Sequence, residues 1–426
     1  MVLSRQDGEG RGLVATMLTM STMTGPDFGA RTTAILDNLD QTRQLKSLQM
    51  IEGPMGPSIT LREHGEVACF CSNNYLGLAN DPQVVEAGIE GLRRYGAGTA
   101  SVRFICGTFA CHETLEARIA SLHDQEASYT FTSCWNANEA IFPTLCEPGD
   151  LLLSDALNHA SIIDGVRLAA VIKKGLHKGV YPHNDLVALR AKLEAARANP
   201  DITGQIWVVT DGVFSMEGDI ADLPGLRAVC NDFDAKLIVD DSHGTGVMGK
   251  TGRGTHEHWG MAGSEIDLFT STLGKALGGG AGGYMAGSQE MIDLMIQRGR
   301  PTLFSNALPA TVACSADKAI ELLMTEPERV ARLRRNVEVA REGIRGVGFE
   351  VLESSTAICP IIVHDTAKAI AMSQRLLELG VFVIGFGFPV VPEGEARLRV
   401  QISAAHEDHH LEALISGLTA LKKEFS

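Results

Sequence analysis

Apolar positions in the middle of the chain follow two alternating spacings. Residues 113–122 and the segment after Asp185 carry Leu or Ile every three to four positions, which predicts amphipathic helices. Short, uninterrupted apolar runs stand between such segments and predict strands buried on both faces of a sheet. The alternation predicts an α/β fold with a large, mostly parallel sheet. The predicted strands cover residues 127–132, 151–153, 206–210, 237–240 and 268–271.

The N-terminal part has a different pattern. Residues 25–50 suit an amphipathic helix, which Gly and Pro at 53–57 would end. Residues 59–71 alternate in places and suggest a hairpin, and residues 73–77 suggest a turn. We therefore expect residues 1–72 to form an extension and an arm that precede the main fold.

The pattern changes again beyond about residue 306. A helix is predicted over 310–324, a charged segment follows at 326–342, and a last helix begins at about Glu407. Strands are predicted between them at 361–363, 381–384 and 398–403. The pattern therefore predicts a large domain over 73–309 and a smaller α+β C-terminal domain over 310–426.

Composition narrows the class of protein. The net charge of −15 argues against nucleic-acid binding, which needs a basic surface. The longest apolar candidate for a membrane span, residues 379–391, is interrupted by Gly and Pro, so no membrane partner is expected. The nine Cys are odd in number and lack the spacing of a zinc site, so we expect buried, reduced thiols and no metal.

Residues 1–23 leave the location of the protein open. Arg5 and Arg11 would suit a transit peptide, but Asp7 and Glu9 count against one. An extension without fixed structure, or a start at a later Met, is favoured. We expect a cytoplasmic protein, with the mitochondrial matrix as the alternative if this segment is a transit peptide.

A lysine follows one of the predicted buried strands. Lys275 lies among small residues, and a desolvated lysine with a lowered pKa is suited to Schiff-base chemistry. Thr272 can offer a hydroxyl to a phosphate, and the glycines at 278–280 allow close backbone approach. A glycine-rich turn with a solvated lysine is one alternative. A nucleotide loop is another, although the usual glycine spacings are missing.

An acid and a histidine follow the neighbouring predicted strand. Asp240 stands at its end, where α/β proteins place ligand groups, and a carboxylate there can keep a pyridine nitrogen protonated. His243 is three residues further on and can reach a phenolic oxygen. An aspartate that only caps the next turn would explain the acid but not its combination with His243 and Lys275.

Two more segments after predicted strands suit ligand binding. Cys134 and Trp135 open a helix whose backbone amides can bind phosphate, although Trp135 could also belong to the core. His159 follows the strand at 151–153 and could stack on a flat ring. A structural histidine would be the default if His159 stood alone.

The remaining candidate site residues are arginines and histidines, most of them near the C-terminus. Arg397 and Arg399 alternate on one face of a strand, where an inward Arg can hold a carboxylate, and Arg397 is expected at the surface. The histidines at 406, 409 and 410 suit a solvated helix start better than a metal site, and those at 256 and 258 suit a surface turn.

These motifs together resemble the α-oxoamine synthase family of pyridoxal-phosphate enzymes from about Leu36 to the C-terminus. The resemblance implies fold type I, the aspartate-aminotransferase-like architecture, with the cofactor in the large domain. The motifs that carry it are Asn-Asn-Tyr-Leu-Gly at 73–77, Ser-Val-Arg-Phe-Ile-Cys-Gly-Thr at 101–108, Asn-His-Ala-Ser-Ile-Ile-Asp-Gly at 158–165, Thr-Asp-Gly-Val-Phe-Ser-Met-Glu-Gly at 210–218, Asp-Asp-Ser-His at 240–243 and Thr-Leu-Gly-Lys-Ala-Leu-Gly-Gly at 272–279.

The resemblance implies a role for each candidate around the cofactor ring. Lys275 would form the Schiff base with pyridoxal phosphate and then act as the general base. Asp240 would hold the pyridine nitrogen, and His159 would stack on the ring. His243 and Ser215 would contact the phenolic oxygen, and Ser215 would also lie beside the substrate.

It also implies how the phosphate and the substrate are held. Cys134, Trp135 and Thr272 would bind the phosphate, and Phe304 and Ser305 would reach it from a partner subunit. The active site would therefore lie at the interface of a homodimer. Arg399 and Asn73 would hold the carboxylate of the amino acid.

The substrates follow from four stretches, at 101–108, 300–306, 385–392 and 399–406. Within the family these are similar to members that condense glycine with acetyl-CoA to 2-amino-3-oxobutanoate and CoA, or run the reverse reaction in threonine breakdown. Members that use another amino acid and acyl-CoA, such as alanine with pimeloyl-CoA or serine with palmitoyl-CoA, remain the alternative. A non-catalytic scaffold subunit is the alternative of a different class.

Overall fold

The computed structural model of the chain describes residues 27–42, 44–388 and 390–425. The chain divides into two units, residues 1–48 and 49–426. In the first unit, α1 (Phe28–Gln41) begins where the carboxylate of Asp27 accepts the N–H of Gly29. The helix is shorter than the predicted 25–50: it ends at Gln41, and the described residues from 42 to 50 are not helical. The expectations for residues 1–23 lie outside the described residues.

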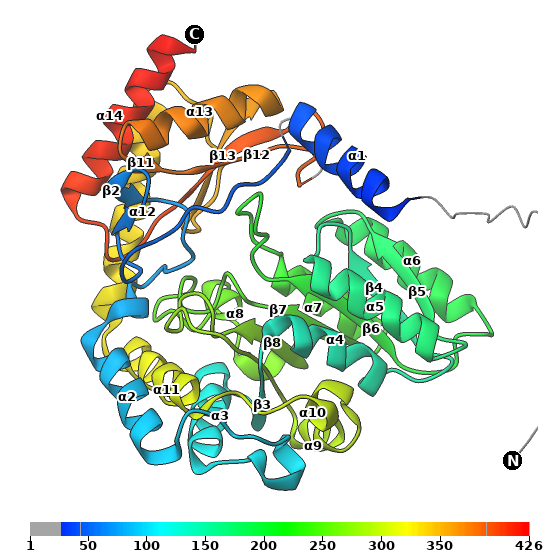
Figure 1. The fold of residues 1–426 in the computed structure, drawn as a ribbon. Coiled ribbons are helices and arrows are strands. Elements are labelled where there is room, and N and C mark those ends of the chain that lie inside the picture. The colour runs from blue at the N-terminus through cyan, green and yellow to red at the C-terminus, as the bar shows by residue number, and fades with distance from the viewer. Residues whose placement is uncertain (1–26, 43, 389, 426) are drawn as a thin grey trace, which may run out of the picture. The chain divides into compact units, whose positions relative to one another are not determined.

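The second unit is built on a seven-stranded sheet with the order β3-β9-β8-β7-β6-β4-β5 (Figure 1). Its strands pair in parallel except for β9, which is antiparallel to both of its neighbours. All five predicted strands are present. The strands are β3 (Ala127–Phe131), β4 (Leu151–Asp155), β5 (His177–Tyr181), β6 (Ile206–Asp211), β7 (Ala235–Asp240), β8 (Leu268–Thr272) and β9 (Gly283–Gly287).

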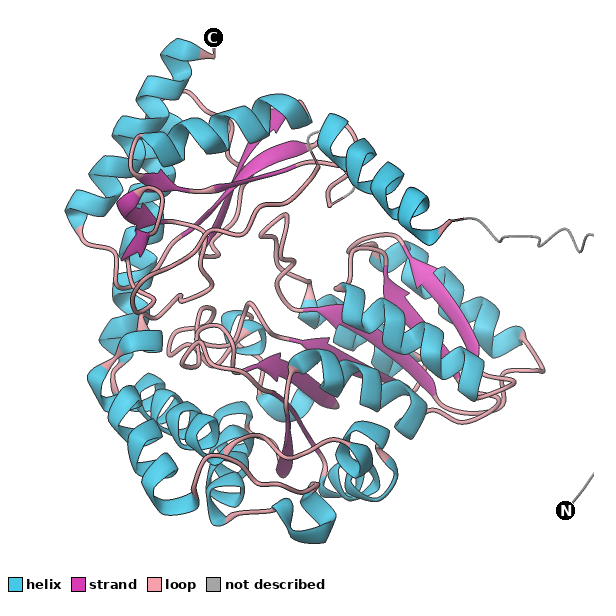
Figure 2. Ribbon diagram, in the orientation of Figure 1, coloured by secondary structure: helices cyan, strands magenta, loops and turns pink. Residues whose placement is uncertain are grey.

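Helices cover both faces of this sheet (Figure 2). Side chains alternate between the faces, so Leu152 packs in one apolar cluster while Leu151 and Leu153 pack in another. The first cluster includes α4 (Cys134–Leu145), α5 (Ala160–Ile172) and α9 (Gln289–Arg298). The second includes α3 (Ala110–His123), α6 (Leu186–Ala198) and α7 (Leu223–Asp232).

Two three-stranded sheets accompany the large one. The predicted hairpin is confirmed as β1 (Ser58–Leu61) and β2 (Gly65–Cys69), and β11 (Val381–Phe382) extends it in parallel. The other sheet has the order β10-β13-β12. The predicted strand at 381–384 is therefore two strands, because β11 pairs with β2 while β12 pairs with β13. The bounds are β10 (Ile358–His364), β12 (Ile384–Phe386) and β13 (Ala396–Gln401).

The remaining helices surround these sheets. The predicted helix at 310–324 is confirmed as α11, and the charged segment after it is also helical. The bounds of these remaining helices are α2 (Pro82–Tyr95), α8 (Thr255–His258), α10 (Arg300–Phe304), α11 (Ala310–Thr325), α12 (Pro327–Gly346), α13 (Thr366–Glu378) and α14 (Asp408–Glu424).

The architecture confirms the predicted fold class. A large, mostly parallel sheet with helices on both faces is followed by a smaller α+β part. One buried apolar cluster runs from the large sheet, through α11 and α12, to β13 and α14. Within the described part of the chain, no helix is both long enough and apolar enough to cross a lipid bilayer.

Candidate active site

Eight of the predicted site residues line one cavity of about 250 Å³, which we call the Lys275 pocket. It lies where β6, β7 and β8 end, the edge at which open α/β sheets bind ligands. The first turns of α4 and α5 close it. The lining residues are Ser133, Cys134, Trp135, His159, Ser161, Asp211, Val213, Ser215, Asp240, Ser242, His243, Thr272 and Lys275.

Lys275 lies three residues beyond the end of β8 and is half-buried. Burial lowers the pKa of its amine, and the negative charges of Asp240 and Asp211 oppose this only in part. A lowered pKa raises the fraction of neutral amine, which is the nucleophilic form. The geometry therefore favours a reactive lysine over the solvated lysine of a glycine-rich turn.

Asp240 is held by two donors. Its Oδ2 accepts a hydrogen bond of 2.6 Å from Nδ2 of Asn138, and its Oδ1 accepts one of 3.0 Å from the backbone N–H of Ser242. The amide of Asn138 also donates to Oγ of Ser161 at 2.9 Å. These bonds fix the carboxylate in one orientation in the pocket. Asn138 was not among the predicted site residues.

His159 caps the N-terminus of α5. Its Nδ1 lies 2.8 Å from Oγ of Ser161, and its backbone N–H donates to Oδ2 of Asp211 at 3.0 Å. The ring of Trp135 meets the imidazole edge to face, with centroids 6.1 Å apart. Burial lowers the pKa of His159, while the charge of Asp240 acts in the opposite sense. A neutral, oriented ring of this kind is suited to stacking on a flat ligand.

A hydrogen-bonded chain joins Asn73 to His243. The hydroxyl of Tyr75 lies 2.8 Å from Nδ1 of His243, and Nε2 of Gln401 donates to that hydroxyl at 3.1 Å. The same Nε2 donates to Oδ1 of Asn73 at 2.5 Å. Burial, together with the positive charge of Lys275, holds the pKa of His243 well below its usual value. Tyr75 and Gln401 were not predicted, although Tyr75 belongs to the motif at 73–77.

Arg399 is buried on β13 and does not line the Lys275 pocket. Its Nε donates to the carbonyl oxygen of Ser215 at 2.6 Å, which ties β13 to a residue of the pocket wall. Burial lowers the pKa of its guanidinium, and the side chain of Tyr75 opposes this shift. Asn73 likewise lies outside the pocket lining but is joined to it through the chain of hydrogen bonds above.

The prediction that Arg397 lies at the surface is wrong. Its side chain is only 1% exposed. It donates to the carbonyl oxygen of Met216 at 3.1 Å and forms ion pairs with Glu217 and Glu395. A buried guanidinium is tolerated because these acceptors replace water. Arg397 therefore fixes the segment that carries Ser215.

Other surface predictions also need correction. His406 and His410 are buried rather than solvated, and Nε2 of His406 lies 2.9 Å from the carbonyl oxygen of Cys69. His256 is buried as well, although a surface turn was expected. Cys106 is exposed, against the expectation of buried thiols. Among the described residues, no three His, Cys, Asp or Glu side chains gather as metal ligands would.

Phe304 and Ser305 do not line the Lys275 pocket. The side chain of Phe304 is 73% exposed at the end of α10. Ser305 lines a separate, narrow cavity together with Thr132 and Asn136, next to the first turn of α4. Their contact with the phosphate of a second subunit stays a prediction.

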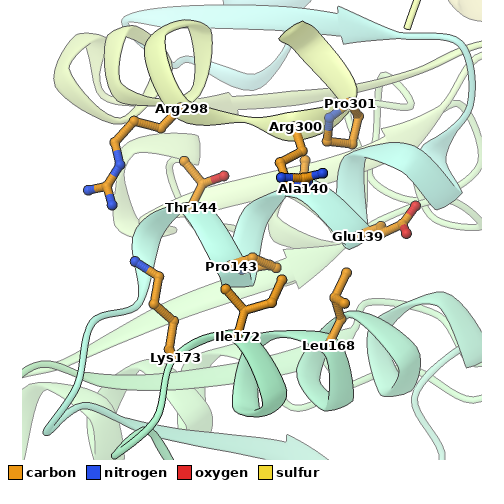
Figure 3. Close-up of a pocket in the computed structure, with 10 residues that line it drawn as sticks. All are labelled: Glu139, Ala140, Pro143, Thr144, Leu168, Ile172, Lys173, Arg298, Arg300 and Pro301. Atoms are coloured by element: carbon orange, nitrogen blue, oxygen red, sulfur yellow. The ribbon is translucent and has the colours of Figure 1, made fainter. Parts of the chain in front are cut away.

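A second, larger cavity of about 410 Å³ lies between α4, α5 and α9 (Figure 3), and we call it the basic cavity. Lys173 and Arg298 both pair with Glu147, at 2.8 and 2.9 Å. Arg300 lies 5.4 Å from the ring centroid of Phe304. Its lining residues are Glu139, Ala140, Pro143, Thr144, Leu168, Ile172, Lys173, Arg298, Arg300 and Pro301.

The two cavities are neighbours along α4. Trp135 lines the Lys275 pocket and Glu139 lines the basic cavity. Residues four apart share one helix face, about 6 Å apart along the axis. Trp135 and Glu139 therefore place the two cavities along the same face of α4.

The groups in the Lys275 pocket fit pyridoxal phosphate. Lys275 offers an amine to an aldehyde, Asp240 a carboxylate to a pyridine nitrogen, and His159 a ring face. The N-terminus of α4, where Oγ of Ser133 accepts the N–H of Asn136, and the hydroxyl of Thr272 are suited to binding the phosphate. At Gly283, a Cβ would come within 2.2 Å of the backbone nitrogen of Cys134, so only glycine allows β9 to pack against this turn.

Comparisons with known proteins agree with this geometry. A family model described as aminotransferase class I and II matches residues 66–418. The mitochondrial 2-amino-3-ketobutyrate coenzyme A ligase of Homo sapiens is 43% identical over 371 residues, which are 87% of this chain and 86% of the relative. The ligase of Escherichia coli K12 is 40% identical over 379 residues, which are 89% and 93% of the two chains.

Sister proteins are also similar. An 8-amino-7-oxononanoate synthase of Geobacter sulfurreducens is 41% identical over 401 residues, covering 92% of this chain and 99% of the relative. The solved structure of a Sphingomonas wittichii serine palmitoyltransferase matches with a TM-score of 0.86 and 27% identity, covering 93% and 98% of the two chains. These matches confirm the resemblance inferred from the sequence. The chain belongs to the aminotransferase class I and II family.

Proposed function

We propose that this protein is a pyridoxal-phosphate-dependent C-acyltransferase. It condenses glycine with acetyl-CoA to 2-amino-3-oxobutanoate and CoA, or catalyses the reverse reaction in threonine breakdown. The observation that carries the proposal is the convergence of Lys275, Asp240 and His159 in one pocket of a chain that is 43% identical to a 2-amino-3-ketobutyrate coenzyme A ligase.

Pyridoxal phosphate, when bound, supplies an electron sink for the carbanion that forms at Cα of the amino acid. Lys275 would hold the cofactor through its amine, and the same amine would take the proton from Cα of glycine. Asp240, oriented by Asn138, would keep the ring nitrogen protonated. His159 would lie against the ring face, and His243 with Ser215 would contact the phenolic oxygen.

Arg399 and Asn73 hold the carboxylate of the amino acid in this proposal. The guanidinium of Arg399 is oriented because its Nε is bonded to the carbonyl oxygen of Ser215. Arg is suited to this task because its planar fork matches a carboxylate. Asn73 is held by Gln401, which itself reaches Tyr75.

The basic cavity supports binding of an acyl-CoA. Coenzyme A carries several phosphate charges, and Lys173, Arg298 and Arg300 gather around this cavity (Figure 3). The shared face of α4 leads from there towards Trp135 and the Lys275 pocket. We propose that the nucleotide part of acyl-CoA binds the basic cavity while the thioester reaches the pocket.

A homodimer with its active sites at the interface completes the proposal. Phe304, exposed on α10, and Ser305 would reach the cofactor phosphate of the partner subunit. The exposed side chains of Phe104 and Ile105, close to Arg103, supply apolar area for such an interface. We propose no nucleic-acid or membrane partner. The relatives include bacterial and mitochondrial proteins, and we propose a cytoplasmic location with the matrix as the alternative.

The test is a matrix of amino acids against acyl-CoA lengths, following CoA release. Glycine with acetyl-CoA should give the highest kcat/KM. A preference for serine with palmitoyl-CoA or alanine with pimeloyl-CoA would reassign the protein to a serine palmitoyltransferase or 8-amino-7-oxononanoate synthase activity. A non-catalytic scaffold would bind no cofactor and show no visible absorption band, which one spectrum decides.

A further inference from the structure

His183 lies between two carboxylates outside the Lys275 pocket. Its Nδ1 is 3.0 Å from Oδ1 of Asp155, and its Nε2 is 2.7 Å from Oδ2 of Asp219. Both ring nitrogens are therefore donors, so the ring is an imidazolium. The ring of Phe214 packs edge to face against it, with centroids 4.3 Å apart. We call this arrangement of His183, Asp155 and Asp219 the imidazolium clamp.

The two carboxylates belong to the two loops that carry pocket residues. Asp155 ends β4, and its Oδ1 also accepts the N–H of Leu157 at 2.9 Å, in the loop that leads to His159. Asp219 closes the turn that contains Ser215, because its carbonyl oxygen accepts the N–H of Phe214 at 3.1 Å. The imidazolium clamp therefore joins the loop of His159 to the loop of Ser215.

His183 is the side-chain hydrogen-bond partner of Asp219 among the residues that the structure describes. Oδ2 of Asp219 accepts from His183, while its Oδ1 is buried without a hydrogen-bond partner there. Asp155 has a further donor in the backbone N–H of Asn184, at 2.9 Å. Loss of His183 would thus free the Ser215 loop more than the His159 loop.

We propose that His183 is a positioning residue that sets the distance between His159 and Ser215, and through them the orientation of the bound cofactor. The proposal rests on the proposed cofactor roles of these two residues. It needs no particular amino acid or acyl-CoA, so it can be tested apart from the substrate assignment.

The pKa of His183 determines the pH range in which its ring is charged. Burial alone would lower the pKa of His183, but the hydrogen bonds and charges of Asp155 and Asp219 outweigh this and raise it to about 10. Tyr181 and Asp211 both interact electrostatically with Asp155, and Glu217 interacts with the charges of both His183 and Asp219. The imidazolium of His183 is therefore charged at neutral pH and loses its proton only as the pH rises towards about 10, which leaves two carboxylates facing a neutral ring.

The test compares holoenzymes of the wild type, His183→Gln and His183→Lys. The readouts are the visible circular dichroism of the bound cofactor, the rate of cofactor release, and kcat and KM. Gln cannot carry the charge, so the dichroism should fall and cofactor release should be faster. The value of kcat should fall by about 10-fold, within the roughly 100-fold that an ångström of misplacement can cost in rate. Lys restores a cation between the carboxylates and should recover most of the loss.

The pH dependence separates positioning from general stability. Wild-type dichroism should decline as the pH rises towards about 10, and His183→Gln should lack that decline. His177→Gln is the matched control, because His177 is a half-buried histidine of β5 that is not a member of the imidazolium clamp and should behave as wild type. Equal dichroism, release rate and pH profile in His183→Gln and the wild type would overturn the proposal.

A second variant covers the case in which His183→Gln fails to fold. Asp219→Asn removes one carboxylate and keeps the ring, and should give the same changes to a smaller degree. In the double variant His183→Gln/Asp219→Asn, the losses should be less than the product of the single losses, because both break the same contact. Independent, multiplicative losses would contradict the clamp.

Discussion

The hydroxyl of Tyr75 lies 2.8 Å from Nδ1 of His243 and also accepts the amide of Gln401. We expect Tyr75→Phe to leave both partners buried without this bond, at a cost of about 1–3 kcal/mol in unfolding free energy. KM for glycine should rise more than kcat falls, because Gln401 also holds Asn73. Chemical denaturation and steady-state kinetics measure this. Tyr129→Phe, a buried tyrosine of β3, is the control; equal glycine KM values in both variants would contradict the prediction.

Lys275→Ala should abolish the covalent link to the cofactor. Because one residue supplies both the amine and the general base, turnover should fall by more than the ~10²–10⁴-fold of a single acid–base group. Absorption spectra and single-turnover assays with CoA detection measure the two effects. Lys178→Ala, on β5, should leave both unchanged. A Lys275→Ala protein that keeps the wild-type band would show that another amine holds the cofactor.

Asp240→Asn should retain the cofactor and lose the carbanion step. Asn cannot stabilise the ring-nitrogen proton. Its NH2 group would also face either the amide of Asn138 or the backbone N–H of Ser242, both of which donate to the carboxylate of Asp240 in the wild type. Exchange of the Cα hydrogens of glycine with solvent should fall by about 100-fold or more. NMR in deuterium oxide measures it, and exchange at the wild-type rate would remove Asp240 from the mechanism.

Arg300→Ala tests the basic cavity. Loss of one phosphate contact should raise KM for acetyl-CoA by roughly 5- to 10-fold, equivalent to about 1 kcal/mol, and leave KM for glycine unchanged. The control is Arg167→Ala, an exposed arginine of α5 that pairs with Asp164 outside the cavity lining. If both variants changed KM for acetyl-CoA alike, general surface charge rather than the cavity would be responsible.

The buried His406 should make the free energy of unfolding fall in mild acid. Burial lowers its pKa from 6.5 to about 4. Between these pH values the unfolded chain therefore binds a proton at this residue and the folded chain does not. The stabilisation is present above pH 6.5 and is lost as the pH falls from 6.5 through about 4, by up to about 3 kcal/mol. Urea unfolding across this range measures it. His406→Gln should show a shallower slope than the wild type, and an equal slope would assign the effect to other groups.

The predictable part of the site lies close to strand ends in the sequence. Asp240 ends β7, and Lys275 and His159 follow β8 and β4 by a few residues. Buried apolar runs locate such strands, and parallel strands bring their carboxyl ends together, so these residues could be predicted to meet. The family resemblance supplied the roles that spacing alone left open.

The remaining part depends on contacts between distant segments. Tyr75 and Gln401 are 326 positions apart, and no periodicity connects them. Arg397 was misplaced because alternation on β13 gives a face but not what covers it. The segment with Ser215 and Met216 covers that face, so both arginines of β13 are buried beneath it. The split of residues 381–384 into β11 and β12 likewise depends on which partner strand each half meets.

The apolar cluster that continues from the large sheet into β13 and α14 bears on how this chain loses its structure. The proposed domains, 73–309 and 310–426, both contribute residues to that cluster. Heat or denaturant should therefore melt both in a single cooperative transition. A fragment cut after residue 309 would expose apolar surface along its broken core and aggregate, so the two parts could evolve new substrates together but not be exchanged as independent modules.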